Sequence, residues 1–452
     1  MAAHPLPPLN TRIGFHYYPD TVHFRESDLH AWVPELRAIG ASWLVLTAPT
    51  DRAIPEYFIH GLIQAGIEPI LHFQLSLQKP VAAEDMKVFF ESYAKWGVHY
   101  AILFDRPNSR SAWTPSAWAQ EDLVERFIDR FVPLADAAAA AGLYPAFPPL
   151  EPGGDYWDTA FLQSGLRSLQ RRKQADILEK LVLSAYAWTG EHSLNYGAGG
   201  PERWPGARPY MTPVNEEDER GFRIFDWYLA ISRSALARTC PVLVLAGNSP
   251  LDHQKVPAPV VNPTIHAQSA LSIARLLTGE TVPDVETPNR NLDPIPDAVL
   301  SGNFWLLAAA PTSPAQSQAW FQNGGHTLPV VGAFRQWVTS KYGSQLEAAN
   351  LSPKSIGLGP VERPAIDHYL LLPTYEWGVA DYHLDIIRPY VKKHHPTIGF
   401  SLVEAEHARQ VTVLGGPQVF PDEAIDHLRS VGCSVERING DGTTIATLMA
   451  AR

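Results

Sequence analysis

The stretch Tyr100–Trp113, which reads YAILFDRPNSRSAW, is the part of the sequence that says most about the fold. Its apolar run, Ala101–Phe104, predicts a buried strand. The strand stops at Asp105-Arg106-Pro107, because proline has no N–H with which to continue a ladder. Charged side chains are therefore expected at the carboxyl end of a buried strand.

The same alternation of apolar strand and amphipathic helix continues on both sides of this stretch, with a repeat of roughly 30 residues. Such repeats predict right-handed β–α–β units. The predicted strands are 12–18, 43–46, 68–74, 100–104, 143–147, 180–186, 241–248 and 302–307. We predict an α/β fold in which residues 1–342 form a (β/α)8 barrel. The side chains that follow the strands would then share one face, where barrel enzymes place their active sites.

The C-terminal part of the chain shows a second pattern. Apolar periodicity fades between Tyr342 and Ala365, where Ser, Asn, Gly and Pro are frequent, so residues 343–365 are expected to be a linker. Strands and helices alternate again in residues 366–452, which predicts a small Rossmann-like or flavodoxin-like α/β domain. Residues 411–440 resemble the type-two cell-wall-binding repeat of bacterial surface proteins, a strand-Gly-Gly-helix-strand unit. The resemblance implies a cell-wall or protein partner for this domain.

Residues 12–342 resemble the barrels of a large clan of retaining glycoside hydrolases, the cellulase-like and β-xylosidase-like enzymes. The family has Asn-Glu-Pro-Asn after strand four, followed by a Trp. Here Asp105-Arg106-Pro107-Asn108 stands in that place, and Trp113 follows. The family ends strand seven with Thr-Glu, whereas this chain has Leu245-Ala246. The resemblance implies a carbohydrate-active barrel in which both the acid/base and the nucleophile are replaced.

Retaining hydrolysis needs two carboxyl groups that face each other across the scissile bond. Arg106 cannot donate the proton because a guanidinium stays protonated at neutral pH, and Ala246 cannot attack. If the barrel is catalytic, carboxylates after other strands must do the work. Asp105 is the first candidate and Glu191 the second, with Asp155 as an alternative partner. The wider set of acidic candidates is Asp20, Glu151, Asp158 and Asp252.

We expect the barrel to bind a poly- or oligosaccharide, because aromatic rings stack on the C–H faces of sugars and the chain has 13 Trp. The arginine and the asparagines would bind hydroxyl groups or an anionic sugar. The candidate binding residues are His16, Tyr18, Arg106, Asn108, Trp113, Trp188, Trp204, Asn248 and Trp305. Two alternatives remain open: an active glycosidase that uses Asp105 with Glu191 or Asp155, and a non-catalytic surface or assembly scaffold.

Charge and composition narrow the partners. The net charge of −11 and the absence of basic runs argue against nucleic acid, and the apolar runs are too short to span a membrane. Cys240 and Cys433 are expected to be free thiols, and no spaced His/Cys set predicts a metal or cofactor. The segment 1–15 has no leader-like pattern, so we expect an extracytoplasmic protein if a leader has been removed and a cytoplasmic one otherwise.

Overall fold

The computed structural model describes residues 4–247, 262–287, 289–348, 366–373, 381–394, 396–440 and 442–450. The chain divides into two compact units, Met1–Leu351 and Ser352–Arg452. Asn248 and Asp252, two of the candidate residues, lie outside the described residues. The helix that ends the first unit, α11 (Pro329–Ala348), continues past residue 342, where the sequence pattern places the end of the barrel.

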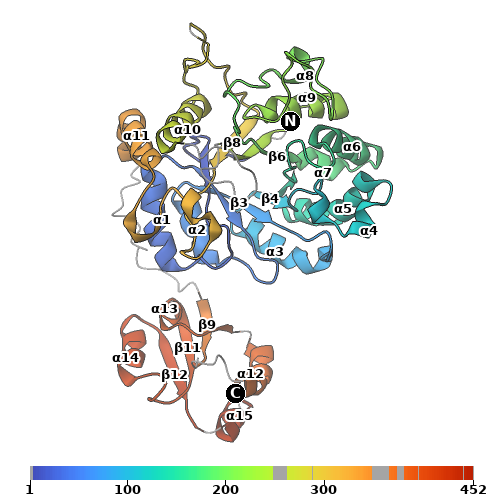
Figure 1. Cartoon of the computed structure of the whole chain (residues 1–452). Coiled ribbons are helices and arrows are strands. Elements are labelled where there is room, and N and C mark those ends of the chain that lie inside the picture. Colours follow the sequence, from blue (N-terminus) through green and yellow to red (C-terminus); the bar gives the residue numbers. More distant parts are fainter. Residues whose placement is uncertain are drawn as a thin grey trace. The chain divides into compact units, whose positions relative to one another are not determined.

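The first unit is a closed barrel of eight parallel strands, ringed by helices on its outside (Figure 1). Each strand pairs with the next one in sequence, and β8 pairs with β1 to close the ring. This confirms the predicted (β/α)8 barrel. The strands are β1 (Ile13–His16), β2 (Trp43–Thr47), β3 (Glu68–Phe73), β4 (Tyr100–Leu103), β5 (Tyr144–Phe147), β6 (Val182–Tyr186), β7 (Val242–Ala246) and β8 (Val299–Phe304).

One long helix follows each strand, and shorter helical turns decorate the loops. The long helices are α1 (Glu26–Ala38), α2 (Glu56–Gln64), α3 (Ala83–Lys95), α5 (Leu123–Ala141), α6 (Asp158–Arg171), α9 (Ile224–Leu236), α10 (Pro263–Leu277) and α11. The short ones are α4 (Pro115–Trp118), α7 (Ala175–Lys180) and α8 (Gly200–Arg203).

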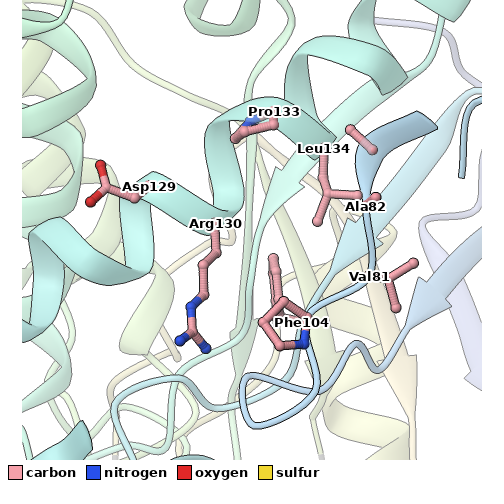
Figure 2. Close-up of a pocket in the computed structure, with 9 residues that line it drawn as sticks. Val81, Ala82, Phe104, Asp129, Arg130, Pro133 and Leu134 are labelled. Carbon is pink, nitrogen blue, oxygen red and sulfur yellow. The ribbon is translucent and has the colours of Figure 1, made fainter. Parts of the chain in front are cut away.

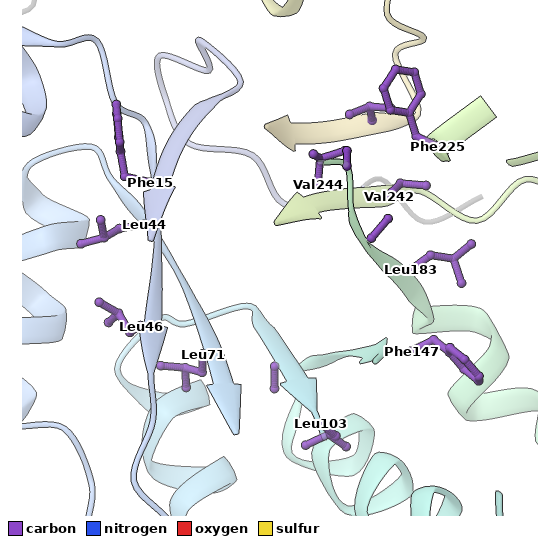
Figure 3. Close-up of a cluster of buried hydrophobic side chains, with 14 of the residues drawn as sticks. Phe15, Leu44, Leu46, Leu71, Leu103, Phe147, Leu183, Phe225, Val242 and Val244 are labelled. Atoms are coloured by element: carbon purple, nitrogen blue, oxygen red, sulfur yellow. The ribbon is translucent and has the colours of Figure 1, made fainter. Parts of the chain in front are cut away.

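Side chains alternate along each strand between the helix layer and the barrel interior, as the period of two requires. Leu44 and Leu46 of β2 belong to the outer core between strands and helices, whereas Trp43 and Val45 belong to the inner one. Figure 3 shows the outer core, with apolar side chains that project from the strands towards the helices. The same alternation decides which polar side chains enter the barrel at the carboxyl ends of the strands.

The eighth strand begins three residues earlier than predicted, at Val299 instead of Gly302, and ends at Phe304. Gly302 lies inside the strand and faces Leu277 of α10. A Cβ at position 302 would come within 2.6 Å of the Leu277 side chain. The glycine therefore allows close helix–strand packing, which no local pattern reveals. Trp305 consequently follows the strand and does not lie within it.

The second unit is a four-stranded parallel sheet in the order β10-β9-β11-β12, with helices on both faces. This confirms the predicted small α/β domain. Tyr369 and Val411 pack in one core with Leu428 of α14, and Leu370 packs in the other core with Met449 of α15. The elements are β9 (Ile366–Leu371), α12 (Asp381–His394), β10 (Thr397–Gly399), α13 (Leu402–Ala405), β11 (Ala408–Leu414), α14 (Asp422–Ser430), β12 (Ser434–Ile438) and α15 (Gly442–Ala450).

Candidate functional site

Two histidines enter the barrel interior near the carboxyl ends of β1 and β3. His16 is 7% exposed, and its Nε2 contacts the carbonyl oxygen of Leu245. His72 is 2% exposed, and its Nε2 lies 3.0 Å from the carbonyl oxygen of Phe104. Burial lowers the pKa of His16 to about 3, and burial also lowers the pKa of His72. Both imidazoles are therefore neutral at physiological pH and cannot act there as proton donors from a charged form.

A cluster of charged groups lies beside the histidines, where β4, β5 and β6 end. We call Asp105, Arg106, Glu151 and Tyr186 the Arg106 cluster. The guanidinium carbon of Arg106 lies 4.4 Å from the centre of the Tyr186 ring. Its Nε lies 2.9 Å from Glu151 Oε2 and its Nη1 lies 3.7 Å from Asp105 Oδ2. The Tyr186 hydroxyl donates to Asp105 Oδ1 at 2.8 Å. One cation is thus enclosed by two carboxylates and one aromatic face.

The backbone of this segment is unusual. Phe104 has φ of +70° and Arg106 has φ of +44°, both in the left-handed region that non-glycine residues seldom adopt. The backbone N–H of Arg106 donates to the carbonyl oxygen of Pro149 at 2.9 Å, which ties the β4 loop to the β5 loop. Strained backbone of this kind is concentrated at ligand-binding and catalytic sites. It turns Arg106 towards the interior, where the next strands supply its partners.

The groups of the Arg106 cluster shift each other's pKa values. Burial lowers the pKa of the Arg106 guanidinium, but Tyr186, Asp105 and Glu151 together outweigh that effect and the pKa is raised. Burial and the neighbouring Asp105 raise the pKa of the Tyr186 hydroxyl well above its usual value, so the phenol stays protonated. The cluster reaches solvent, because the side chains of Asp105, Arg106 and Glu151 are 23%, 37% and 45% exposed.

An aromatic row continues from the cluster across β6 and β8. The Trp188 ring stacks near the Tyr186 ring, with centroids 6.1 Å apart and planes inclined by 13°. The Trp305 ring meets Trp188 edge-on at 6.1 Å and contacts the His16 ring at 5.0 Å. The Trp305 indole N–H donates to Gln318 Oε1 at 2.7 Å, which holds its orientation. Trp188 and Trp305 are partly exposed, so ring faces border the charged cluster.

Two of the predicted binding residues are used inside the protein. Asn108 is fully buried and holds the β5–α6 loop. Its amide nitrogen donates to the carbonyl oxygens of Glu151 and Tyr156, both at 2.9 Å, and its carbonyl oxygen accepts from Glu151 N at 2.8 Å. Trp113 is 3% exposed, and its indole N–H donates to the carbonyl oxygen of Pro107 at 2.7 Å. Asn108 therefore positions Glu151, and Trp113 anchors the loop after β4.

The remaining candidates have separate surroundings. Tyr18 is partly exposed and stacks on His23, which is hydrogen bonded to Asp20. The Trp204 indole N–H donates to the Ala198 carbonyl oxygen at 3.0 Å. Glu191 is exposed on the loop after β6, and Asp155 accepts from the backbone N–H of Arg110 at 2.7 Å.

The barrel thus brings together His16, Asp105, Arg106, Trp188 and Trp305 of the predicted set. Glu151 belonged only to the wider set of acidic candidates, and neither Tyr186 nor His72 was among the residues predicted from the sequence. A signal for the last two exists in the alternation of their strands, because inward-facing polar residues at strand ends are the ones that reach a barrel's mouth.

A pair of buried acids lies next to this loop. Asp158 Oδ1 accepts from Gly153 N at 2.9 Å, and Asp158 Oδ2 accepts from the Tyr228 hydroxyl at 3.1 Å. Glu219 is 2% exposed. Burial first, and the neighbouring Asp158 second, raise the pKa of Glu219 to about 9. The two acids titrate together, and the pair keeps a proton at neutral pH.

A cavity of about 220 Å³ lies on the outside of the barrel, between the segment before α3 and helix α5 (Figure 2). Its lining is mostly apolar, with Asp129 and Arg130 as the charged members. Its other lining residues are Pro80, Val81, Ala82, Ala83, Phe104, Pro133 and Leu134. None of the four residues of the Arg106 cluster lines it.

Within the described residues, no group of three or more His, Cys, Asp or Glu side chains is arranged to hold a metal ion. No helix in the described ranges is both long enough and apolar enough to cross a membrane.

The closed parallel sheet, with a polar and aromatic site where its strands end, defines the first unit as a (β/α)8 barrel. No model of a known protein family matches the chain, and no curated protein matches it. Solved structures similar to the chain include several glycoside hydrolases. One is a family 39 glycoside hydrolase from Bacteroides cellulosilyticus WH2, with 11% identity and a TM-score of 0.45, over 73% of this chain and 63% of that one.

A second is a family 128 endo-β-1,3-glucanase from Sorangium cellulosum, with 12% identity and a TM-score of 0.39, over 72% of this chain and 97% of that one. A third is an endocellulase from Pyrococcus horikoshii, with 13% identity and a TM-score of 0.40, over 72% of this chain and 91% of that one. At these values the similarity describes the barrel and says nothing about the ligand.

Proposed function

We propose that the barrel binds a poly- or oligosaccharide at the carboxyl ends of its strands, and that it does not cleave the ligand with residues 106 and 246. The observation that carries this proposal is the continuous row of Tyr186, Trp188, Trp305 and His16 beside the Arg106 cluster. A pyranose has an apolar C–H face and a rim of hydroxyl groups. Partly exposed indole rings suit the face, and carboxylate and guanidinium groups suit the rim.

Two features support binding without cleavage at the usual positions. Ala246 is fully buried at the end of β7, where the resembled family places its nucleophile. Arg106 follows β4, where that family places its acid. Asp105 and Glu151 both form ion pairs with the guanidinium, and Asp105 also accepts a hydrogen bond from Tyr186, so both carboxylates are already engaged within the protein. The Arg106 guanidinium stays protonated. The Tyr186 hydroxyl is then the one group of the Arg106 cluster with a proton to transfer, and it already donates that proton in a hydrogen bond to Asp105.

An active glycosidase is the alternative, and its two carboxylates would differ from the pair that the sequence suggested. The Arg106 cluster pairs Asp105 with Glu151, through Arg106, and not with Glu191 or Asp155. Because one guanidinium lies between them, the facing carboxylate oxygens are no more than roughly 9 Å apart, a limit that allows the spacing of either retaining or inverting enzymes. We expect no release of reducing ends from neutral or acidic polysaccharides. If the protein does release reducing ends, and if Asp105→Asn abolishes that release, the proposal of binding without cleavage is wrong.

Binding itself is tested by affinity gel electrophoresis against a panel of soluble β-glucans, xylans, mannans and polyuronates. At least one polysaccharide should retard the protein. Trp188→Ala and Trp305→Ala should each weaken that retardation about five- to thirtyfold, because a sugar–indole stack contributes about 1–2 kcal/mol. Trp96→Ala is the matched control, since Trp96 lies at the end of α3, away from the strand ends. Retardation that is lost equally in the control, or no retardation by any polysaccharide, would contradict the proposal.

For the second unit we retain cell-wall binding as a proposal. It is supported by the order of β11, Gly415-Gly416, α14 and β12, which follows the strand-Gly-Gly-helix-strand plan of the resembled repeat. Protein docking, as in an assembly scaffold, is the alternative for this unit.

A further inference from the structure

We infer that the barrel site selects saccharides that carry no carboxylate group, and that Glu151 and Asp105 exclude acidic sugars. The inference rests on the proposed saccharide binding and specifies its ligand. From the sequence, Arg106 at a strand end would suit hydroxyl groups or an anionic sugar equally. The contacts of Arg106 in the folded protein separate these two possibilities.

A sugar carboxylate is recognised by arginine through two parallel N–H donors on one edge of the guanidinium. The two edges with paired donors are Nε with Nη2, and Nη1 with Nη2. Glu151 lies 2.9 Å from Nε, and Asp105 lies 3.7 Å from Nη1. The Nε–H does not point along its contact with Glu151, so that contact is an ion pair without a hydrogen bond. Each edge nevertheless has a carboxylate beside one of its nitrogens, and a ring covers one face.

The charge balance of the site leads to the same conclusion. The Arg106 cluster contains two carboxylates and one guanidinium. His16 and His72 add no positive charge near neutral pH, since burial keeps both imidazoles neutral. Glu151 is the most exposed of the three charged groups, at 45%. A ligand carboxylate that approaches Arg106 therefore meets like charge first, whereas the hydroxyl groups of a neutral sugar can donate to the same oxygens.

The repulsion is large enough to measure. Like charges a few ångströms apart at a partly exposed site change affinity by about tenfold or more, and salt reduces the effect. We expect the discrimination to shrink as the salt concentration rises. A purely steric exclusion of the extra oxygens would not respond to salt.

The experiment uses matched polymers that differ only in charge. Hydroxyethylcellulose and laminarin are each prepared in native form and with part of their C6 alcohols oxidised to carboxylates. The full-length protein should bind whichever native glucan it recognises at least tenfold more tightly than the oxidised form at low salt. Glu151→Gln should strengthen binding of the oxidised form at least fivefold and narrow the preference. Asp105→Asn should act in the same direction, and its amide oxygen can still accept from Tyr186.

Glu91→Gln is the control, because it removes the same charge from an exposed position on α3, away from the carboxyl ends of the strands. It should leave the preference unchanged. Equal or tighter binding of the oxidised glucan by the unaltered protein would overturn the inference and leave saccharide binding standing. An unchanged preference in both Glu151→Gln and Asp105→Asn, with both variants folded by circular dichroism, would also overturn it. Failure of native and oxidised glucans, and of every other polysaccharide in the panel above, would overturn the proposed function.

Discussion

Arg106 organises the charged groups at the carboxyl end of β4. In the resembled enzymes this place after β4 holds a carboxylic acid, which needs an accessible proton. Here the side chain is a permanent cation that draws Glu151 from the next loop and lies over Tyr186 from β6. The left-handed backbone at Phe104 and Arg106 costs about 1–2 kcal/mol per residue, so the contacts made by the side chain must offset it. Arg106 thus joins the segment after β4 to the loop after β5 and to the end of β6.

We predict that Tyr186→Phe lowers the stability of the protein. The variant keeps the ring beneath Arg106 and removes only the hydroxyl that donates to Asp105 Oδ1. We expect a loss of about 1–2 kcal/mol in unfolding free energy, because the bond joins a buried phenol to a charged acceptor. Urea unfolding followed by tryptophan fluorescence measures it. Tyr57→Phe serves as the control, since its hydroxyl donates to a backbone carbonyl on the outside of the barrel. A larger loss in the control would contradict the assignment.

The loop between β5 and α6 is the element on which the site depends most. Glu151 reaches Arg106 because Asn108 bonds both the N–H and the carbonyl oxygen of Glu151. At the other end of the loop, Asp158 accepts from Gly153 N. The loop is therefore fixed at both ends by buried polar groups. Removing such a side chain is costly, because its hydrogen-bond partners stay buried and can bond neither to the protein nor to water.

Asn108→Ala should destabilise the protein by about 2–4 kcal/mol, because three hydrogen bonds to the loop are lost. It should also weaken saccharide binding, since Glu151 loses its support. Both quantities are measured on the same samples, by urea unfolding and by affinity electrophoresis. Gln78→Ala removes an exposed amide with longer bonds of 3.3 and 3.4 Å and should change neither by more than a small amount. Full stability in Asn108→Ala would contradict the role given to this side chain.

The buried acid pair makes stability depend on pH in a defined direction. The pKa of Glu219 rises from 4.5 to about 9 on folding. Between these values the folded protein holds a proton that the unfolded chain releases, so stability falls as pH rises from about 5 to about 9. Glu219→Gln should flatten this slope by up to about 1.4 kcal/mol per pH unit. Urea unfolding of both proteins at several pH values measures this slope. Glu202→Gln, at an 80% exposed side chain, should keep the original slope.

At the scale of the whole molecule, the chain consists of two compact units with separate cores. The barrel contains every residue of the Arg106 cluster and of the aromatic row. The second unit has its own parallel sheet with helices on both faces. A function at the mouth of the barrel should therefore not require the second unit, and cell-wall binding should not require the barrel site.

A chain that ends at Leu351 should fold and retain the saccharide affinity of the full protein within about twofold. The reason is that all contacts of the site lie within the first unit. Affinity electrophoresis compares the two proteins directly. Purified bacterial cell walls should sediment the full chain and leave the shortened one in solution. Sedimentation of both proteins to the same extent would contradict the role proposed for the second unit.

The succession of strands and helices could be predicted because hydrophobic periodicity is a local property. Each strand shows its own apolar run, and Asp105 and Arg106 follow such a run whatever the rest of the chain does. The boundary of β8 could not be predicted, because Gly302 is explained by its contact with Leu277 on another element. The same holds for Trp113 and Asn108. Their residue types suggested ligand contacts, and only the folded chain shows that they are buried.

The sequence alone determined the succession of strands and helices of a barrel, with Arg106 after the fourth strand and Ala246 at the end of the seventh. The tertiary structure decided what surrounds them. Glu151 and Tyr186 lie 45 and 80 residues beyond Arg106 along the chain and meet it because β4, β5 and β6 are hydrogen-bonded neighbours in a closed ring. Strand pairing between distant segments depends on register and closure, which no short stretch encodes. The charge of the site is a property of that arrangement, and so is the kind of sugar it can accept.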